Sequence, residues 1–158
     1  PGCKAYRKLY TLELLGFAVA KAQAWIPTSN GEWLATEWLH GEEPEELRLP
    51  EIAAYLARLH AFGVGFRDAK PSNFVRNDAL KLIDADGIQG GRPNSWRDLG
   101  RVLAECDAQS DMETTCLQVY AKTWCGSRGL ESAPWDIPTM AQKCEPHAQR
   151  FRGLLRAD

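Results

Sequence analysis

Four polar side chains in one stretch of the chain have the types and the spacing needed for phosphoryl transfer. Asp68 and Asn73 are five residues apart with Lys70 between them, and Asp84 follows eleven residues later, after an apolar run. Mg²⁺ prefers oxygen ligands, so the amide of Asn73 and the carboxylate of Asp84 are candidate metal ligands. Asp68 can orient an acceptor hydroxyl and take its proton, and Lys70 can reach the transferred phosphoryl group as a point charge. The pattern therefore predicts the catalytic and metal-binding half of a phosphotransferase site.

The alternative is a loop whose Asp and Asn side chains only cap turns. Two flanking features argue against it: a helical segment that ends at Gly63 just before the loop, and a short apolar strand that delivers Asp84 after it. The spacing of the three residue types alone would arise by chance in about 2% of chains of this size, and the two flanking features make a chance match much rarer.

The first forty residues predict a helix followed by a hairpin. A helix over residues 4–15 ends at Gly16, where a glycine is a natural stop. An apolar strand region over residues 17–26 and a partner strand over residues 32–39 flank an Asn-Gly turn signal. The apolar residues that share one face of this helix are Tyr6, Leu9, Tyr10 and Leu14.

The elements around the candidate site follow from the same spacing rules. A helix begins at Pro50, which suits a first helical turn, and ends at Gly63. Residues 64–75 are expected to form an ordered loop, and residues 80–83 a strand that leads into a turn at residues 85–87. In the helix that begins at Pro50, the predicted core-facing residues are Ile52, Tyr55, Leu56 and Leu59.

The remainder of the chain is expected to be mainly helical, which predicts an α+β protein. Ser95 is the expected cap of one helix, and a second helix covers residues 111–123. Pro146 should break or kink the helical stretches of the tail. The residues expected to face inward are Trp96, Leu99, Val102 and Leu103 in the first helix and Met112, Cys116, Val119 and Tyr120 in the second.

Composition excludes several function classes. The 158 residues carry a net charge of −2, so bulk attraction to nucleic acid or to an anionic membrane is not expected. No apolar run is long enough for a transmembrane helix. The five cysteines are odd in number without Cys-x-x-Cys spacing, and the histidines are far apart, so we expect reduced, buried thiols in a cytosolic protein rather than a zinc site. The start at Pro1, without Met or a signal core, indicates a piece of a longer chain.

Five segments resemble the protein-kinase-like superfamily, and within it the bacterial lipopolysaccharide core kinases (the Kdo and heptose kinases). LARLHAFGVGFRDAKPSNFV resembles their Leu-His-x-x-Gly helix and catalytic loop, LIDADG resembles their metal-binding strand, and SWRDLGRVL resembles the helix that follows. Earlier, LELLGFAVAKAQAW and WLATEWLHG resemble the regulatory helix with its next strand and the strand into the adenine hinge. The resemblance covers residues 4–105.

This resemblance implies a kinase-like fold. Residues 1–40 would be a partial small lobe with a regulatory-type helix, a hairpin and the hinge, and residues 41–158 a mainly helical large lobe. Asp98 would anchor the catalytic loop with support from Arg67, and His60 would be structural. The residues implied at the nucleotide edge are Glu37, Trp38 and Leu39.

The implied reaction is ATP- and Mg²⁺-dependent phosphorylation of a hydroxyl on a lipopolysaccharide-core sugar or a similar acceptor. The implied place is the cytoplasm, with peripheral association at the inner face of the inner membrane. Neither a transmembrane segment nor a nucleic-acid partner is implied. Nothing in the residues themselves identifies the acceptor as a sugar, so an aminoglycoside-type or a Ser/Thr-type kinase stays open.

Some family features are missing from these 158 residues. A Gly-rich phosphate loop and the lysine strand that follows it are not in the sequence, and the expected glutamate near residues 5–7 is replaced by Ala5, Tyr6 and Arg7. Phe66 stands where histidine is usual. The chain is therefore either a truncated kinase or a pseudokinase, a binding or regulatory module without transfer activity. Alone, it is expected to show little turnover and marginal stability.

Several other residues leave two interpretations each. Asp86 is a second metal contact or a support of its turn. Arg92, Arg97 and Arg101 form a basic patch for a phosphorylated saccharide or an ordinary helix surface. The six tryptophans are expected in the core rather than on a stacking platform. An exposed, solvated linker is expected for Glu42, Glu43, Glu45 and Glu46.

Overall fold

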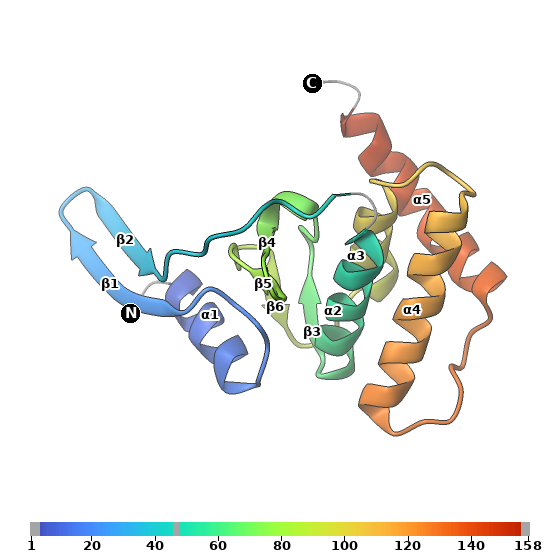
Figure 1. The fold of residues 1–158 in the computed structure, drawn as a ribbon, viewed down its shortest axis with the longest axis horizontal. Helices are drawn as coiled ribbons and strands as arrows, with labels where there is room; N and C mark the ends of the chain where they lie inside the picture. Colours follow the sequence, from blue (N-terminus) through green and yellow to red (C-terminus); the bar gives the residue numbers. More distant parts are fainter. Residues whose placement is uncertain (1–3, 46–47, 156–158) are drawn as a thin grey trace. The chain divides into compact units, whose positions relative to one another are not determined.

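The computed structural model describes residues 4–45 and 48–155, which form two compact units (Figure 1). Cys3 and Glu46 lie outside the described residues. The first unit comprises Pro1–Glu43 and Ser72–Asp86, and the second comprises Pro44–Pro71 and Gly87–Asp158. The lobe boundaries 1–40 and 41–158 stay a prediction, while these units group residues 72–86 with the N-terminal segment. Each unit is described by itself.

The first unit combines one helix with two hairpins. The strands β1 and β2 pair through a two-residue turn between Thr28 and Gly31, and β4 pairs antiparallel with β5. A parallel bridge joins Val19 to Leu82, and an antiparallel bridge joins Glu42 to Arg76. The elements are α1 (Lys4–Leu14), β1 (Ala22–Thr28), β2 (Gly31–Thr36), β4 (Phe74–Arg76) and β5 (Leu80–Leu82).

The helix and the hairpin of this unit are confirmed, but of the four apolar residues predicted to share one face of α1, only Leu9 is buried. Leu9 and Leu12 are buried, whereas Tyr10 and Leu14 are 47% and 70% exposed. Two apolar stripes overlap on this helix, and the spacing does not say which one packs against the sheet. Strand β2 also ends at Thr36 rather than at residue 39.

The described residues of the second unit form four helices and a short two-stranded sheet. Helix α2 begins with Pro50 in its first turn and stops before Gly63, which has a φ of +74°, and its predicted core positions are buried. Helix α2 packs on α4, and α3 packs on α5. The elements are α2 (Leu49–Ala61), β3 (Val64–Phe66), β6 (Ile88–Gly90), α3 (Ser95–Leu103), α4 (Asp111–Arg128) and α5 (Ile137–Leu155).

In the helices of this unit, the predicted cap of α3 and the predicted break at Pro146 are wrong, while a kink at Pro146 stays a prediction. The cap of α3 is Asn94, whose side chain accepts a hydrogen bond from the Arg97 amide, and not Ser95. Helix α5 continues through Pro146 instead of breaking there. Pro146 and Gln142 are both exposed, so water can satisfy the carbonyl that has lost its helical partner.

The predicted loop over residues 64–75 contains more regular structure than expected. It includes β3, a 3₁₀ turn at Pro71–Asn73 and the start of β4, and the turn after Asp84 leads into β6. Each of these strands has only three residues, which is too short to show a hydrophobic period.

Two tryptophans of the hairpin segment contradict the prediction that all six lie in the core. Trp33 is 68% and Trp38 is 82% exposed. In the second unit, Trp135 packs against Trp96 and Trp124 with ring centroids 5.0 and 4.8 Å apart. The linker residues Glu42, Glu43 and Glu45 are exposed as predicted.

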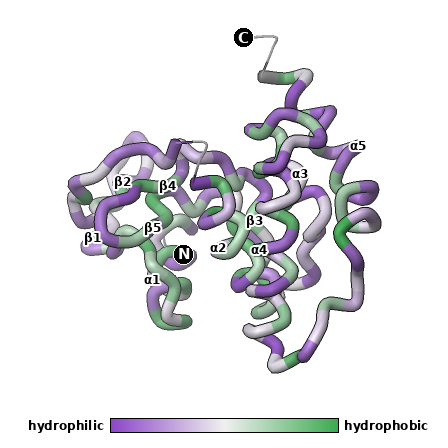
Figure 2. The backbone as a smooth tube through the Cα atoms, turned by 45° about the vertical axis from the view of Figure 1, so that its right-hand side comes forward, coloured by the Kyte–Doolittle hydropathy of each residue, from purple (hydrophilic) through white to green (hydrophobic). Residues whose placement is uncertain are grey.

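Within the described residues, five helices and three two-stranded antiparallel sheets confirm the α+β class. The helices change between hydrophilic and hydrophobic residues along their length, as Figure 2 shows, which is typical of helices with one buried face. Among the described residues, no helix is both long and apolar enough to cross a membrane. Four cysteines, Cys106, Cys116, Cys125 and Cys144, are free and buried.

Candidate active site

The loop that carries Asp68 and Lys70 follows β3 directly. Phe66 is fully buried and pairs with Ile88 of β6. The Arg67 amide donates to the Gly87 carbonyl over 3.1 Å, while the Arg67 side chain is exposed. A Cβ at Gly87 would lie 2.9 Å from the Asp68 nitrogen and from the Phe66 ring, so only glycine allows this close approach. The backbone around Gly87 therefore fixes the start of the loop.

The Asp68 carboxylate lies between two cations of the second unit. Its Oδ2 is 3.4 Å from Lys70 Nζ, and its Oδ1 is 4.0 Å from Arg101 Nε. The side chain of Asp68 is 45% exposed, so a substrate can reach it. A carboxylate held in this way can orient a hydroxyl and accept its proton.

Asp98 on α3 holds the backbone of the same loop. Its side chain is fully buried, and its Oδ2 accepts a hydrogen bond of 2.9 Å from the Phe66 amide. Arg97 donates to Oδ1 from Nε and Nη2 over 2.9 and 2.6 Å. Burial alone raises the pKa of Asp98, but the nearby His60 imidazole and the Arg97 guanidinium outweigh it and hold the pKa below its usual range. Asp98 is thus an ionised anchor that holds the loop backbone at Phe66, two residues before Asp68.

His60 continues this buried polar network toward α4. Its Nε2 lies 3.4 Å from Asp98 Oδ2, and its Nδ1 lies 2.6 Å from the Tyr120 hydroxyl. Burial raises the pKa of Tyr120, so the phenol stays protonated and can donate to Nδ1. A side chain this deeply buried supports α3 and does not meet a substrate.

The candidate metal ligands lie in the first unit, where the two chain segments that carry them are hydrogen-bonded. The Ile83 amide donates to the Asn73 carbonyl over 2.9 Å, and Asp84 follows Ile83 directly. Asn73 is buried and Asp84 is exposed. Asn73 and Asp84 therefore lie on neighbouring backbone segments at the same end of the β4–β5 pair.

The turn after Asp84 is held by its own hydrogen bonds. Asp84 Oδ1 accepts from the Asp86 amide over 2.8 Å, and the Asp86 carbonyl accepts from Lys8 Nζ of α1 over 2.7 Å. Asp86 therefore supports the turn through its backbone, while its exposed carboxylate leaves the second interpretation, a metal contact, open.

The side-chain types of Asn73 and Asp84 are ones that could hold a Mg²⁺ ion together with substrate phosphates. The described residues contain no group of three His, Cys, Asp or Glu side chains that could hold a metal ion alone. Mg²⁺ commonly keeps several waters and binds one or two protein oxygens plus substrate phosphates. Asn73 and Asp84 supply that small number of oxygens.

The residues expected at the nucleotide edge belong to the first unit and remain a prediction. Glu37 Oε1 lies 3.4 Å from Lys81 Nζ and accepts from the Lys21 amide over 3.2 Å. Trp38 is exposed, and its ring stands at 80° to that of His40, with the ring centroids 6.3 Å apart. Leu39 is half-buried.

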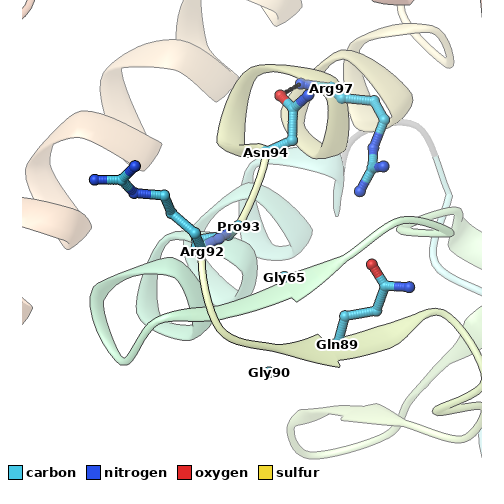
Figure 3. Close-up of a pocket in the computed structure, with 7 residues that line it drawn as sticks. All are labelled: Gly65, Gln89, Gly90, Arg92, Pro93, Asn94 and Arg97. Carbon is cyan, nitrogen blue, oxygen red and sulfur yellow. Dashed lines mark hydrogen bonds between the residues drawn. The ribbon is translucent and has the colours of Figure 1, made fainter.

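The three arginines considered for a basic patch do not act alike. Arg101 is buried and ion-paired, and Arg97 is committed to Asp98. Arg92 and Arg97 line a pocket of about 100 Å³ together with Gln89. Figure 3 shows the Arg92 side chain pointing away from Gln89 and Arg97. A single patch of three converging guanidinium groups is therefore not formed.

Sequence reasoning did not single out Lys8, and it did not assign to Arg97, Arg101 and Tyr120 the contacts that they make. Lys8 contacts the turn after Asp84, and Arg97, Arg101 and Tyr120 surround the anchor and the loop. Lys8 and Tyr120 meet partners 78 and 60 residues away, so no local pattern identifies them. For Arg101, its position three residues after Asp98 on one helix was the available signal.

Comparison with known proteins gives one limited similarity. No family model matches the chain. A stretch of 94 residues is 35% identical to "Cell division cycle 7-related protein kinase" from Mus musculus, and it covers 58% of this chain. The chain spans only 16% of that protein's length. Part of the chain is therefore similar to a protein kinase, and this similarity does not extend to a lipopolysaccharide acceptor.

Proposed function

We propose that this chain carries the catalytic and metal-binding residues of an ATP-dependent phosphotransferase with a protein-kinase-like fold. The observation that carries the proposal is the backbone hydrogen bond from Ile83 to Asn73, which places the two segments that carry Asn73 and Asp84 side by side. The anchored loop with Asp68 and Lys70 and the similarity to a protein kinase support the same conclusion.

Each residue has a distinct role in this proposal. Bound Mg²⁺-ATP supplies the phosphoryl group and neutralises its negative charge. Asn73 and Asp84 hold the metal, with an amide oxygen that adds no further negative charge. Asp68 orients the acceptor hydroxyl and accepts its proton, and Lys70 provides a positive charge for the transferred group. Glu37, Trp38 and Leu39 contact the nucleotide edge, and Arg67 and Asp98 support the loop.

The proposed acceptor is a hydroxyl of a lipopolysaccharide-core sugar, and the proposed place is the cytoplasmic face of the inner membrane. The support is the resemblance of the three segments around Asp68, Asp84 and Asp98. A protein hydroxyl is the competing acceptor, supported by the similarity to a protein kinase. Turnover of a core saccharide and of a Ser/Thr peptide by the same preparation separates the two.

A pseudokinase is the second candidate function. Helix α1 has Ala5, Tyr6 and Arg7 where a kinase is expected to have a glutamate, and its Lys8 binds the turn after the metal-binding strand instead. Under this alternative the protein binds a nucleotide and transfers nothing. Nucleotide binding without Asp68-dependent turnover would favour it.

The decisive experiment compares Asp84→Ala and Asp68→Ala in the full-length protein. Asp84→Ala should weaken Mg²⁺-dependent nucleotide binding, because it removes a metal ligand. Asp68→Ala should leave binding within twofold and lower kcat by about 10²- to 10⁴-fold, because it removes the proton acceptor. Isothermal titration and a coupled ADP-release assay measure the two effects. Asp78→Ala, an exposed carboxylate between β4 and β5, is the matched control. Unchanged binding and turnover in both variants would refute the site.

A further inference from the structure

Arg101 links the candidate catalytic loop to the helical part of the second unit. It lies on α3 three residues after Asp98, so the two side chains share a face of the helix. Its side chain is only 8% exposed. Its Nη1 donates to Glu105 Oε1 over 2.5 Å, and its Nε is 4.0 Å from Asp68 Oδ1. Helix α3 thus holds the loop backbone through Asp98, and its Arg101 side chain faces the carboxylate of Asp68.

The two cations beside Asp68 differ in how firmly they are held. Lys70 belongs to the same loop as Asp68 and its side chain is 37% exposed, so it can move with that loop and with a substrate. Arg101 belongs to a helix and is almost completely enclosed. A guanidinium presents several donors in a fixed plane, so Arg101 can meet Glu105 and Asp68 at once. A lysine amine at this position could serve only one of them well.

Helix α5 holds Arg101 in place. The Phe151 ring lies beneath the guanidinium, with 5.5 Å between the ring centroid and Cζ. Arg152 donates to the Leu103 carbonyl over 3.0 Å and to the Cys106 carbonyl over 3.3 Å, which caps the end of α3. A Cβ at Gly100 would lie 2.7 Å from the His147 Cβ, so α3 and α5 touch closely beside Arg101.

We propose that Arg101 is a positioning residue for the Asp68 carboxylate, and that α5 acts in catalysis by keeping Arg101 in this position. The inference rests on the proposed role of Asp68. Arg101 fixes the rotation of the carboxylate by attracting Oδ1, which leaves Oδ2 directed toward Lys70. It assigns a role to the C-terminal helix, for which the sequence shows no motif.

The competing explanation is that Arg101 only neutralises Glu105 and packs on Phe151. Removing the arginine alone would leave Glu105 without its partner, so lower activity of Arg101→Gln could reflect lower stability. The double variant Arg101→Gln/Glu105→Gln removes both charges and keeps an amide pair of similar shape. It separates loss of fold from loss of positioning.

The test measures kcat, the KM for Mg²⁺-ATP and the melting temperature of the full-length protein. Positioning predicts that Arg101→Gln and the double variant both lose about 10- to 100-fold in kcat, with the nucleotide KM within about twofold, because misplacement of a catalytic group slows the chemical step. Arg101→Lys should lose less, since it keeps the charge. The control is Arg150→Gln on the exposed side of α5, which should behave as the wild type.

The outcomes distinguish this inference from the proposed function. A double variant with wild-type kcat and restored melting temperature overturns the positioning role, while Asp68-dependent turnover of the wild type leaves the proposed function standing. A proportional rise in nucleotide KM would also overturn it, because Arg101 would then act on binding. A wild-type protein without any Asp68-dependent turnover overturns both.

Discussion

Asp98 is a carboxylate without solvent access whose partners keep it ionised. Because its pKa is lower in the folded state than the value near 4 of an exposed Asp, the unfolded chain takes up its proton first as the pH falls. The stabilisation is therefore complete above about pH 4 and is lost as the pH falls through the folded-state pKa. Asp98→Asn should cost about 3 kcal/mol at pH 7, because Arg97 loses its buried partner.

Urea denaturation between pH 7 and pH 3 measures the difference in the free energy of unfolding between the wild type and Asp98→Asn. It should shrink as the pH is lowered, since the wild type becomes protonated as well. Asp78→Asn, at an exposed carboxylate, serves as the control and should follow the wild-type curve. A difference that is constant over this range would show that the Asp98 charge does not stabilise the fold.

At the scale of single residues, the sequence identifies the groups that do chemistry better than the groups that hold them. The fixed spacing of Asp68, Lys70 and Asn73 is visible because it lies within one loop. Lys8 and Arg101 are found only in the folded chain, because they meet their partners across 78 and 33 residues. The pairing of distant residues depends on packing that no local pattern encodes.

At the scale of elements, the contact of α3 with α5 depends on one glycine. Replacing Gly100 by alanine would place a Cβ 2.7 Å from the His147 Cβ and 3.0 Å from the Cys144 carbonyl oxygen. The second contact is to backbone, so α5 itself must move. Gly100→Ala should therefore lower the free energy of unfolding by about 1–3 kcal/mol, despite the better helix propensity of alanine. Chemical denaturation gives this value directly.

Gly126 on α4 is the matched control for this substitution. A Cβ there would meet nothing within 4 Å. Gly126→Ala should raise the free energy of unfolding by about 0.5–1 kcal/mol, because alanine loses less conformational entropy in a helix. If both alanine variants were stabilised equally, the close contact of α3 and α5 would be refuted.

The elements that were predicted well have strong local signals. Helix α2 shows a regular apolar spacing together with Pro50 and Gly63 at its ends, and all of these features act as expected. The three-residue strands β3, β4 and β6 give no such signal, because pairing with a neighbour defines them. Helix α5 passes Pro146 because tertiary packing outweighs one missing hydrogen bond.

At the scale of the whole molecule, the sequence gives the α+β class but not the grouping of its segments. Residues 72–86 join the first unit through β4, β5 and the bridges to Val19 and Glu42. These bridges connect chain segments more than thirty residues apart. The second unit contains all four described cysteines, so their reactivity reports on the integrity of that unit.

Thiol modification should therefore follow the unfolding of the second unit. Burial raises the pKa of Cys144 to about 12, so about one thiol in 10⁴ is ionised at pH 8. A hydrogen bond with Cys106 and burial likewise raise the pKa of Cys116. Alkylation of both by iodoacetamide should be at least about a thousandfold slower than that of an exposed thiol, because the thiolate is the reactive form.

Mass spectrometry of the separated peptides after alkylation in increasing urea measures this protection at each cysteine. Cys144 lies where α5 meets α3, so its alkylation should begin at the urea concentration at which the unit unfolds. Gly100→Ala should shift that concentration downward, whereas Gly126→Ala should not. Rapid alkylation of Cys144 without urea would mean that α5 separates from α3 in the native protein. In that case α5 could not hold Arg101 beside Asp68.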